Sequence, residues 1–364
     1  MGVECKIFIE SANGGIFRPR QPVVGKVKYF INKPTIFKTI DMFFLGKATC
    51  QWSAPGPDKL SSEYYNEEEY VNDNRNLFKP QHGQEVFLSG TFEYPFEFLL
   101  PDNIPSSIKY CKGGKIEYKV IVLFVKAKSI RTIKEFSRSI PVYGYVCPCS
   151  REPLKFSLQK NLSSLTAVND FDVKAEIEKT FLTPGDKIKL KLTINNNTDV
   201  SITINTKLIE NYIYVSDDKT SNVVSMPLET TQSSISIVEK SLSVITCIVP
   251  TLPNLYSIQH SKILRREYKV RVTAKLPNPD DNVDVEVPVV IGERRNEDGV
   301  AAADVNEVNY CLSYLIKEIY SHKRTGLRKR GPSKDGRNIE RPLLSSGTKQ
   351  ANKYKKETIY QSLT

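Results

Sequence analysis

The chain has 364 residues, of which 40% are hydrophobic and 26% are charged, so it is long enough for two globular domains with substantial cores. No run reaches the roughly 18–20 consecutive apolar residues of a membrane-spanning helix, and the alternating first residues predict no signal peptide. The net charge of +11 is uneven, because residues 323–356 carry twelve basic and two acidic side chains, a net charge of +10.

Most of the first 295 residues are predicted to be β-strands. Four segments alternate polar and apolar side chains with a period of two, namely 23–30, 115–122, 187–194 and 268–275. Such alternation is typical of strands with one face on a core and the other in water. Prolines and glycines separate these runs at spacings that suit β-sandwiches. We therefore predict an all-β fold class.

The two halves of this region follow the same plan, which indicates an internal repeat. Each begins with an aromatic residue, a proline turn and an alternating strand, at Phe17 and again at Phe181. Each later contains a Tyr-Lys-Val strand, which begins at Tyr118 and at Tyr268. The sequence thus predicts two tandem sandwiches of seven to nine strands each, over residues 1–148 and 151–293, joined near the Cys-Pro-Cys segment.

Residues 294–364 are predicted to form a tail that contains one amphipathic helix. Asp304 and Glu307 form a capping-box pattern, and apolar residues recur at helical spacing over 304–321. Two placements stay open: the helix packs against its own sandwich, or it lies on a membrane or a partner. Beyond residue 321 the composition is basic and poor in apolar residues, so we expect a disordered tail.

One central stretch carries a family resemblance. The segment FEYPFEFLLPDNIPSS at 92–107, its continuation GKIEYKV at 114–120 and the segment VPVVIG at 287–292 resemble the α-arrestins, the arrestin domain-containing proteins. The resemblance covers residues 1–293. It implies two arrestin-type immunoglobulin-like β-sandwiches followed by a short helix and a basic tail.

The resemblance also implies a function. Proteins of this kind are non-enzymatic, cytoplasmic adaptors in membrane-protein trafficking and endocytosis, peripheral at the plasma membrane or endosomes. Their partners are membrane-protein cargo tails, clathrin adaptors and the ubiquitination machinery. A retromer-like coat or sorting subunit of the same fold is the alternative adaptor function.

This chain departs from the family pattern at two places. Arg20 stands where the family has the glycine of its first proline turn, and we expect a type I turn to accommodate the arginine. The sequence contains no Pro-Pro dipeptide and hence no PPxY motif. WW domains grip such motifs, so direct binding of a WW-containing ubiquitin ligase is not expected.

The tail contains one candidate sorting motif and two basic clusters. Tyr360 and Leu363 fit the Tyr-x-x-apolar signal that clathrin adaptors bind as an added strand. The candidate membrane-contact bases are Lys323, Arg324, Arg328, Lys329, Arg330, Lys353, Lys355 and Lys356. Attraction to an anionic membrane surface competes with a merely solvated tail and with a nuclear-import or RNA-binding role; no nucleic-acid partner is expected.

The sequence gives no candidate catalytic, cofactor-binding or metal-binding residues. Seven cysteines are scattered apart from Cys147 and Cys149, so we expect reduced thiols, with a redox or metal role for this pair as the alternative. The three histidines match no catalytic motif. A hydrolase is the competing function of another class, and no motif supports it.

Overall fold

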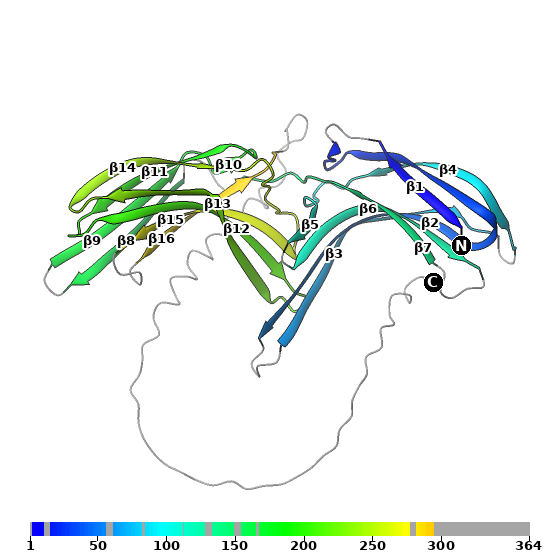
Figure 1. Ribbon diagram of the computed structural model, residues 1–364, viewed down its shortest axis with the longest axis horizontal. Coiled ribbons are helices and arrows are strands. Elements are labelled where there is room, and N and C mark those ends of the chain that lie inside the picture. Colours follow the sequence, from blue (N-terminus) through cyan, green and yellow to red (C-terminus); the bar gives the residue numbers. More distant parts are fainter. Residues whose placement is uncertain are drawn as a thin grey trace, which may run out of the picture. The chain divides into compact units, whose positions relative to one another are not determined.

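The computed structural model describes residues 2–10, 15–55, 61–81, 84–111, 113–127, 133–148, 154–164, 167–276 and 282–294. Within these ranges the chain forms sixteen β-strands and no α-helix (Figure 1). The predicted all-β fold class is confirmed. The predicted helix over 304–321 and the basic tail lie outside the described residues.

The N-terminal half forms a seven-stranded sheet. Its strands are β1 (Val3–Ile9), β2 (Pro22–Pro55), β3 (Ser61–Phe78), β4 (Phe87–Leu99), β5 (Ile108–Cys111), β6 (Gly114–Lys126) and β7 (Ile133–Ile140). The strand β2 is 34 residues long, and its first part pairs with β1 and β4 whereas its second part pairs with β3 and β6. Register shifts between Ile31 and Thr35 and between Phe37 and Thr39 separate the two parts. Because such irregularities bend a strand, β2 serves both pairing zones.

The C-terminal half forms two further sheets. One has five strands in the order β10-β16-β15-β12-β13, and the other has four in the order β14-β11-β9-β8. Their bounds are β8 (Leu154–Ser164), β9 (Ala167–Ile177), β10 (Phe181–Leu182), β11 (Lys187–Asn196), β12 (Ile202–Val215), β13 (Ser221–Ile237), β14 (Ser241–Pro250), β15 (Leu264–Lys275) and β16 (Val283–Ile291). The four segments predicted from alternation fall on β2, β6, β11 and β15.

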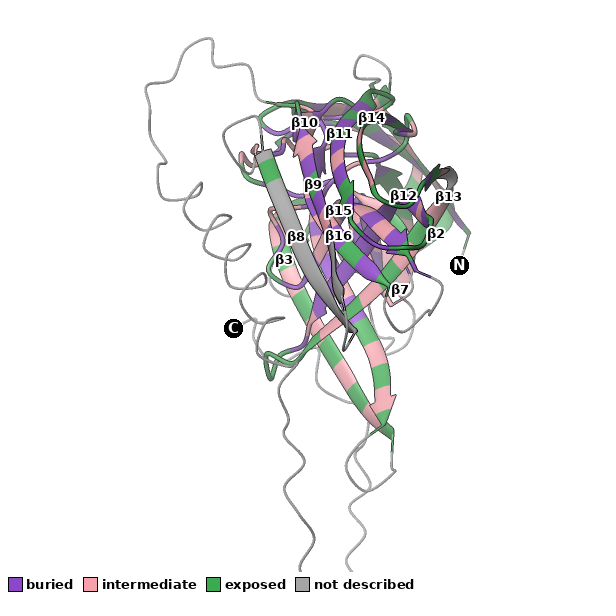
Figure 2. Cartoon of the chain, turned by 90° about the vertical axis from the view of Figure 1, so that its left-hand side faces the viewer, coloured by how far each residue is buried: buried purple, intermediate pink, exposed green. Residues whose placement is uncertain are grey.

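Alternating side chains fill two hydrophobic clusters. On β6, every second side chain from Ile116 to Phe124 is at most 1% exposed. On β11, Ile188, Leu190 and Leu192 are buried between exposed lysines, and the same alternation of buried and exposed residues is visible along the strands in Figure 2. Each fully buried aliphatic or aromatic side chain contributes roughly 1.5–3 kcal/mol, so these inward faces hold the sheets together.

The expectation of a type I turn at Arg20 was wrong. The Gln21 amide donates to the Arg18 carbonyl oxygen at 3.1 Å, and Arg20 has a left-handed φ of 65°. Gly185 has the same kind of conformation, with a φ of 92°, in the corresponding turn of the second half. A left-handed φ at the third position requires a type II geometry, which favours glycine. The Arg20 amide donates to the Leu100 carbonyl oxygen at 3.0 Å, which holds the turn in place.

Candidate functional site

The N-terminal strand β1 has an open backbone edge. In the described part of the chain it forms a ladder with β2 alone. The Asn32 amide donates to the Gly2 carbonyl oxygen, and the Glu10 amide donates to the Val24 carbonyl oxygen. In an antiparallel ladder such pairs recur at every second residue, so the even-numbered residues of β1 bond to β2. The amides and carbonyls of the odd-numbered residues therefore face away from β2.

A groove runs along this open edge. Its volume is about 450 Å³. The other wall of the groove comes from β7, which pairs with β6 in the second pairing zone of the sheet. The lining residues are Cys5, Lys6, Ile7, Phe8, Ile9, Phe136, Ser137 and Arg138. The groove thus combines an unpaired strand edge with apolar side chains.

The groove is also basic. Lys6 and Arg138 line it, and the Lys134 ammonium donates to the carbonyl oxygen of Val3 on the open edge of β1. The same ammonium lies 4.9 Å from the ring centroid of Phe136. Burial raises the pKa of the Cys5 thiol to about 12, an effect that the charge of Lys134 offsets only in part. Cys5 is therefore a neutral thiol at physiological pH, and the charge of the groove comes from its bases.

This geometry suits an extended peptide. A peptide that adds as a strand to β1 satisfies the outward amides and carbonyls of Cys5, Ile7 and Ile9, while alternate side chains enter the groove. Acidic groups on the peptide would meet Lys6, Lys134 and Arg138, which favours an anionic segment.

The two halves of the chain are joined by two sets of side-chain contacts. In the first set, Arg18 donates from Nε and Nη2 to the two carboxylate oxygens of Glu293, each at 2.7 Å. The rings of Tyr143 and Tyr256 are 4.2 Å apart, and the Gln259 amide bonds to both backbone groups of Cys147. The Glu293 hydrogen bond raises the pKa of the Arg18 guanidinium, so the ion pair stays charged.

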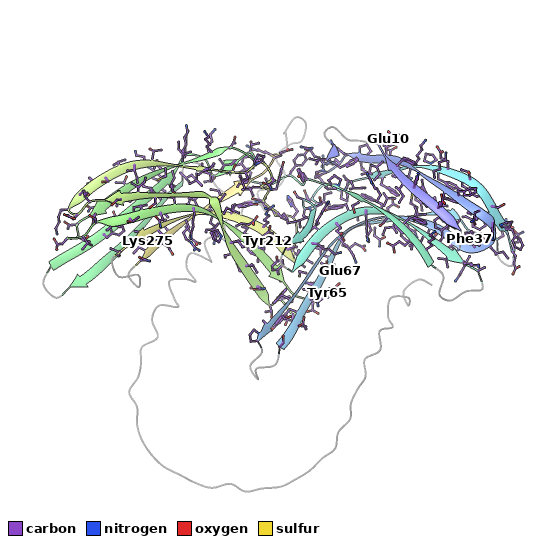
Figure 3. All side chains as sticks on the ribbon, in the orientation of Figure 1. Glu10, Phe37, Tyr65, Glu67, Tyr212 and Lys275 are labelled. Carbon is purple, nitrogen blue, oxygen red and sulfur yellow. The ribbon has the colours of Figure 1, made fainter. Side chains whose placement is uncertain are left out.

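In the second set, the ends of two hairpins meet. The side chains of Tyr214 on β12 and Leu264 on β15 belong to the hydrophobic cluster of the N-terminal half. The Tyr214 hydroxyl donates to the Cys111 carbonyl oxygen at 2.8 Å, and Asn66 of β3 donates to the Val215 carbonyl oxygen at 3.0 Å. Figure 3 labels Tyr212 on β12 together with Tyr65 and Glu67 on the neighbouring part of β3.

A carboxylate reinforces this second set. One oxygen of Glu68 accepts hydrogen bonds from the Ser261 hydroxyl at 2.9 Å and from the Lys262 amide at 2.8 Å. Hydrogen bonds to a charged acceptor are stronger than those between neutral groups. The two halves of the described chain therefore make specific polar contacts as well as apolar ones.

The structure does not describe the functional residues that the sequence predicts. Tyr360, Leu363 and the candidate membrane-contact bases all lie outside the described residues, as do Cys149, His82 and His322. Within the described ranges, no cluster of three potential metal ligands occurs and no helix has the length and apolar character to cross a bilayer.

Sequence reasoning missed the groove. Lys6, Lys134 and Arg138 are isolated bases in ordinary strands, and nothing in their spacing links β1 to β7. The alternation of Cys5, Ile7 and Ile9 predicts a strand but not which of its two edges is open. That information comes only from the pairing of β1 with β2.

Two tandem β-sandwich units with a strand edge open to a peptide define a binding scaffold, and the comparisons with known proteins name its family. The model described as "Arrestin (or S-antigen), N-terminal domain" matches residues 5–145, and "Arrestin (or S-antigen), C-terminal domain" matches residues 169–296. The chain belongs to the arrestin family, and its sequence is α-arrestin-like. The predicted resemblance is confirmed.

Two curated relatives are similar to this chain. An arrestin domain-containing protein of Schizosaccharomyces pombe is 30% identical over 124 residues, which is 31% of this chain and 21% of the relative. Arrestin domain-containing protein B of Dictyostelium discoideum is 23% identical over 269 residues, which is 70% of this chain and 41% of the relative. The matched parts thus span between a fifth and two fifths of these relatives.

Proposed function

We propose that this chain is a non-enzymatic adaptor in membrane-protein trafficking, and that it captures an extended cargo tail as an added strand on β1. Domains of the arrestin family are non-enzymatic adaptors that bind cargo and trafficking partners. The observation that carries the proposal is the open edge of β1 beside a basic, partly apolar groove. Backbone pairing provides affinity without demanding one sequence, which suits a protein that handles several cargoes.

The charge of the groove selects among cargo segments. Lys6, Lys134 and Arg138 favour tails rich in aspartate, glutamate or phosphorylated residues. Because these bases are partly exposed, added salt screens their attraction to such a tail. Affinity for an acidic segment should accordingly fall as ionic strength rises.

The tail of the chain extends this function to the membrane. Its bases, from Lys323 to Lys356, would hold the adaptor at the anionic cytoplasmic surface of the plasma membrane or endosomes. Tyr360 and Leu363 would recruit a clathrin adaptor. Without a PPxY motif, a link to a ubiquitin ligase would require a contact other than a WW domain.

A peptide array tests the cargo proposal. Overlapping segments of the cytosolic tails of integral membrane proteins are probed with the full chain and with the double variant Lys6→Glu/Arg138→Glu. The full chain should bind a subset of the segments that is rich in acidic residues. The double variant should lose binding to most of that subset. Lys33→Glu, an exposed charge reversal outside the groove, is the matched control and should bind as the native chain does.

A second variant tests backbone pairing. Ile7→Pro removes an amide that faces the open edge, so it blocks an added strand while the β1–β2 hydrogen bonds remain. A native thermal transition for Ile7→Pro shows that the fold is intact. If no segment bound by the native chain depends on Ile7 or on the groove bases, the proposed cargo site is wrong.

A further inference from the structure

The edge strand β14 exposes an apolar row. Its even-numbered residues face solvent, and Leu242, Val244 and Ile248 are 70%, 59% and 55% exposed. The odd-numbered residues of the strand face the sandwich interior, where Cys247 and Val249 are buried. Three large aliphatic side chains thus lie in water along one strand of the four-stranded sheet.

The backbone of the same residues is unpaired. β14 pairs with β11 alone, and the Thr251 amide continues that ladder with a 3.0 Å bond to the Asp186 carbonyl oxygen. Because antiparallel pairs alternate, the odd-numbered residues of β14 bond to β11 and the even-numbered ones face the free edge. Within the described ranges, no hydrogen bond joins the amides and carbonyls of Leu242, Val244, Thr246 and Ile248 to another residue.

This edge lacks the protection that three other edges of the described chain have. Exposed edge strands usually avoid pairing through charged side chains, internal prolines or bulges. β7 carries Lys134 and Arg138, β3 carries a run of glutamates, and β13 contains Pro227 and pairs with β12 through a register shift. β14 has no charged residue, its one proline is its last residue, and its ten-residue register with β11 is unbroken.

A row of lysines runs beside the apolar row. On the outer face of β11, Lys187, Lys189 and Lys191 lie opposite Pro250, Ile248 and Thr246. Neither β11 nor β14 carries a carboxylate. Among the side chains that the structure describes, the acids of this face lie on β9: Asp172 pairs with Lys174, and Glu176, which lies opposite Lys191 in the β9–β11 ladder, pairs with Lys155. The lysines next to β14 therefore present positive charge toward the free edge.

We infer that β14 is a second peptide-docking edge, which takes an extended segment of a partner protein with the pattern apolar-x-acidic-x-apolar. The two apolar residues of the partner segment would lie directly opposite Val244 and Ile248 in the new strand pair, where cross-strand side chains are in contact. The acidic residue of the partner segment would lie opposite Thr246. Because the Thr246 side chain is small, the Lys191 ammonium can extend across it to the acidic group. A lipid surface would match the lysines and the apolar row but would leave the aligned backbone groups of β14 without partners.

This edge is independent of the β1 groove. The two sites lie on different sheets of the described chain and share no residue. A chain with both sites holds two extended segments at once, one on each edge.

The test is a selection of random peptides displayed on phage against the full chain. Native protein, Thr246→Pro and Lys191→Glu are compared, with Thr246→Ser as the matched control. The Thr246 amide points to solvent, so proline there removes only the outward donor and keeps the β11–β14 ladder. Peptides with the apolar-x-acidic-x-apolar pattern should be enriched on the native chain and on Thr246→Ser but not on Thr246→Pro.

Fluorescence anisotropy with the selected peptides then gives the magnitudes. Both Thr246→Pro and Lys191→Glu should weaken binding by about tenfold or more, since each removes a contact central to the pairing. Replacing the acidic residue of the peptide by lysine should weaken binding to the native chain and restore it to Lys191→Glu. Binding of acidic segments to the β1 groove should be unchanged in both variants.

Three outcomes would overturn the inference. The first is that no enriched peptide depends on Thr246 or Lys191. The second is that the chain binds phosphatidylserine vesicles but no peptide, and that Lys191→Glu abolishes the binding to vesicles. The third is a dimer in sedimentation that Thr246→Pro dissociates, which would make a second copy of this chain the occupant of the edge. Because Lys191 is exposed and outside the core, Lys191→Glu tests the docking edge even if Thr246→Pro fails to fold.

Discussion

Arg18 and Glu293 are 275 residues apart in sequence and form a two-bond ion pair between the halves of the described chain, with both N–O distances at 2.7 Å. Arg18 is the first residue of the first proline turn, and Glu293 follows the last strand. The pair therefore fastens the beginning of the N-terminal sandwich to the end of the C-terminal one.

Breaking this pair should loosen the junction. We expect Glu293→Gln to lower the free energy of unfolding by about 1 kcal/mol, since the side chains are 25% and 33% exposed and solvent weakens the pair. Hydrogen exchange should increase around Tyr143 and Tyr256. The effect should shrink at 1 M salt, and an equal loss of stability at high salt would contradict an ionic role.

The ion pair between Glu210 and Arg266 lies deeper, with side-chain exposures of 7% and 14%. Arg266 Nε donates to Glu210 at 2.6 Å, and the Tyr268 hydroxyl donates to the same oxygen. We expect Glu210→Ala to cost about 3–5 kcal/mol, because it leaves a buried guanidinium without its partner. Urea denaturation measures the loss.

A double variant separates the cost of an unpaired buried charge from the cost of lost side-chain packing. Glu210→Leu combined with Arg266→Met removes both charges, so it should be markedly more stable than Glu210→Ala. If the double variant is as unstable as the single one, the pair contributes packing rather than charge compensation.

Gly114 marks a close approach between the two halves. A Cβ at this position would lie 2.5 Å from a methyl carbon of Leu264 and 2.9 Å from a ring carbon of Tyr214. Gly114→Val should therefore displace Tyr214 from the N-terminal cluster and increase proteolytic cleavage near the junction, at a cost of about 1–3 kcal/mol.

Glu286 gives the chain a defined response to acid. Burial alone would raise the pKa of this carboxyl, but the hydrogen bonds from Arg271 and the charges of Lys269 and Arg271 bring it below its usual value of 4.5. A depressed folded-state pKa contributes stability that is present above the unfolded pKa and is lost as pH falls through the folded pKa. We expect the urea midpoint of the native chain to fall below pH 4.5 more steeply than that of Glu286→Gln. Parallel curves for the two proteins would show that Glu286 is not responsible.

The alternating segments were sufficient to predict the sandwiches but not their edges. Val27, Tyr118, Leu190 and Val270 all fall on inward faces, because a period of two fixes which side chains share a face. The same reasoning fails on β14, where apolar residues occupy both faces and Ile248 is exposed although it resembles a core residue. Hydrophobicity alone does not distinguish a buried strand from an edge strand with an apolar outer face.

The candidate sites were beyond sequence reasoning for a related reason. Lys6 and Arg138 are separated by most of the N-terminal sandwich, and the pairing of Glu68 with Ser261 joins residues 193 apart. Such contacts depend on the three-dimensional path of β2 and on the junction, neither of which leaves a local pattern. The left-handed φ of Arg20 was missed because the arginine itself gives no sign of it.

The contribution of Tyr214 and Leu264 to the N-terminal hydrophobic cluster has a consequence for the ribosome-bound chain. The strands up to Ile140 emerge while both side chains are still unmade, and translation at about 5–20 residues per second delays Leu264 by on the order of ten seconds. Throughout that interval the apolar surface beside Gly114 has no cover. The nascent N-terminal sandwich is then a substrate for chaperones, and a chain halted before residue 264 should remain bound to them.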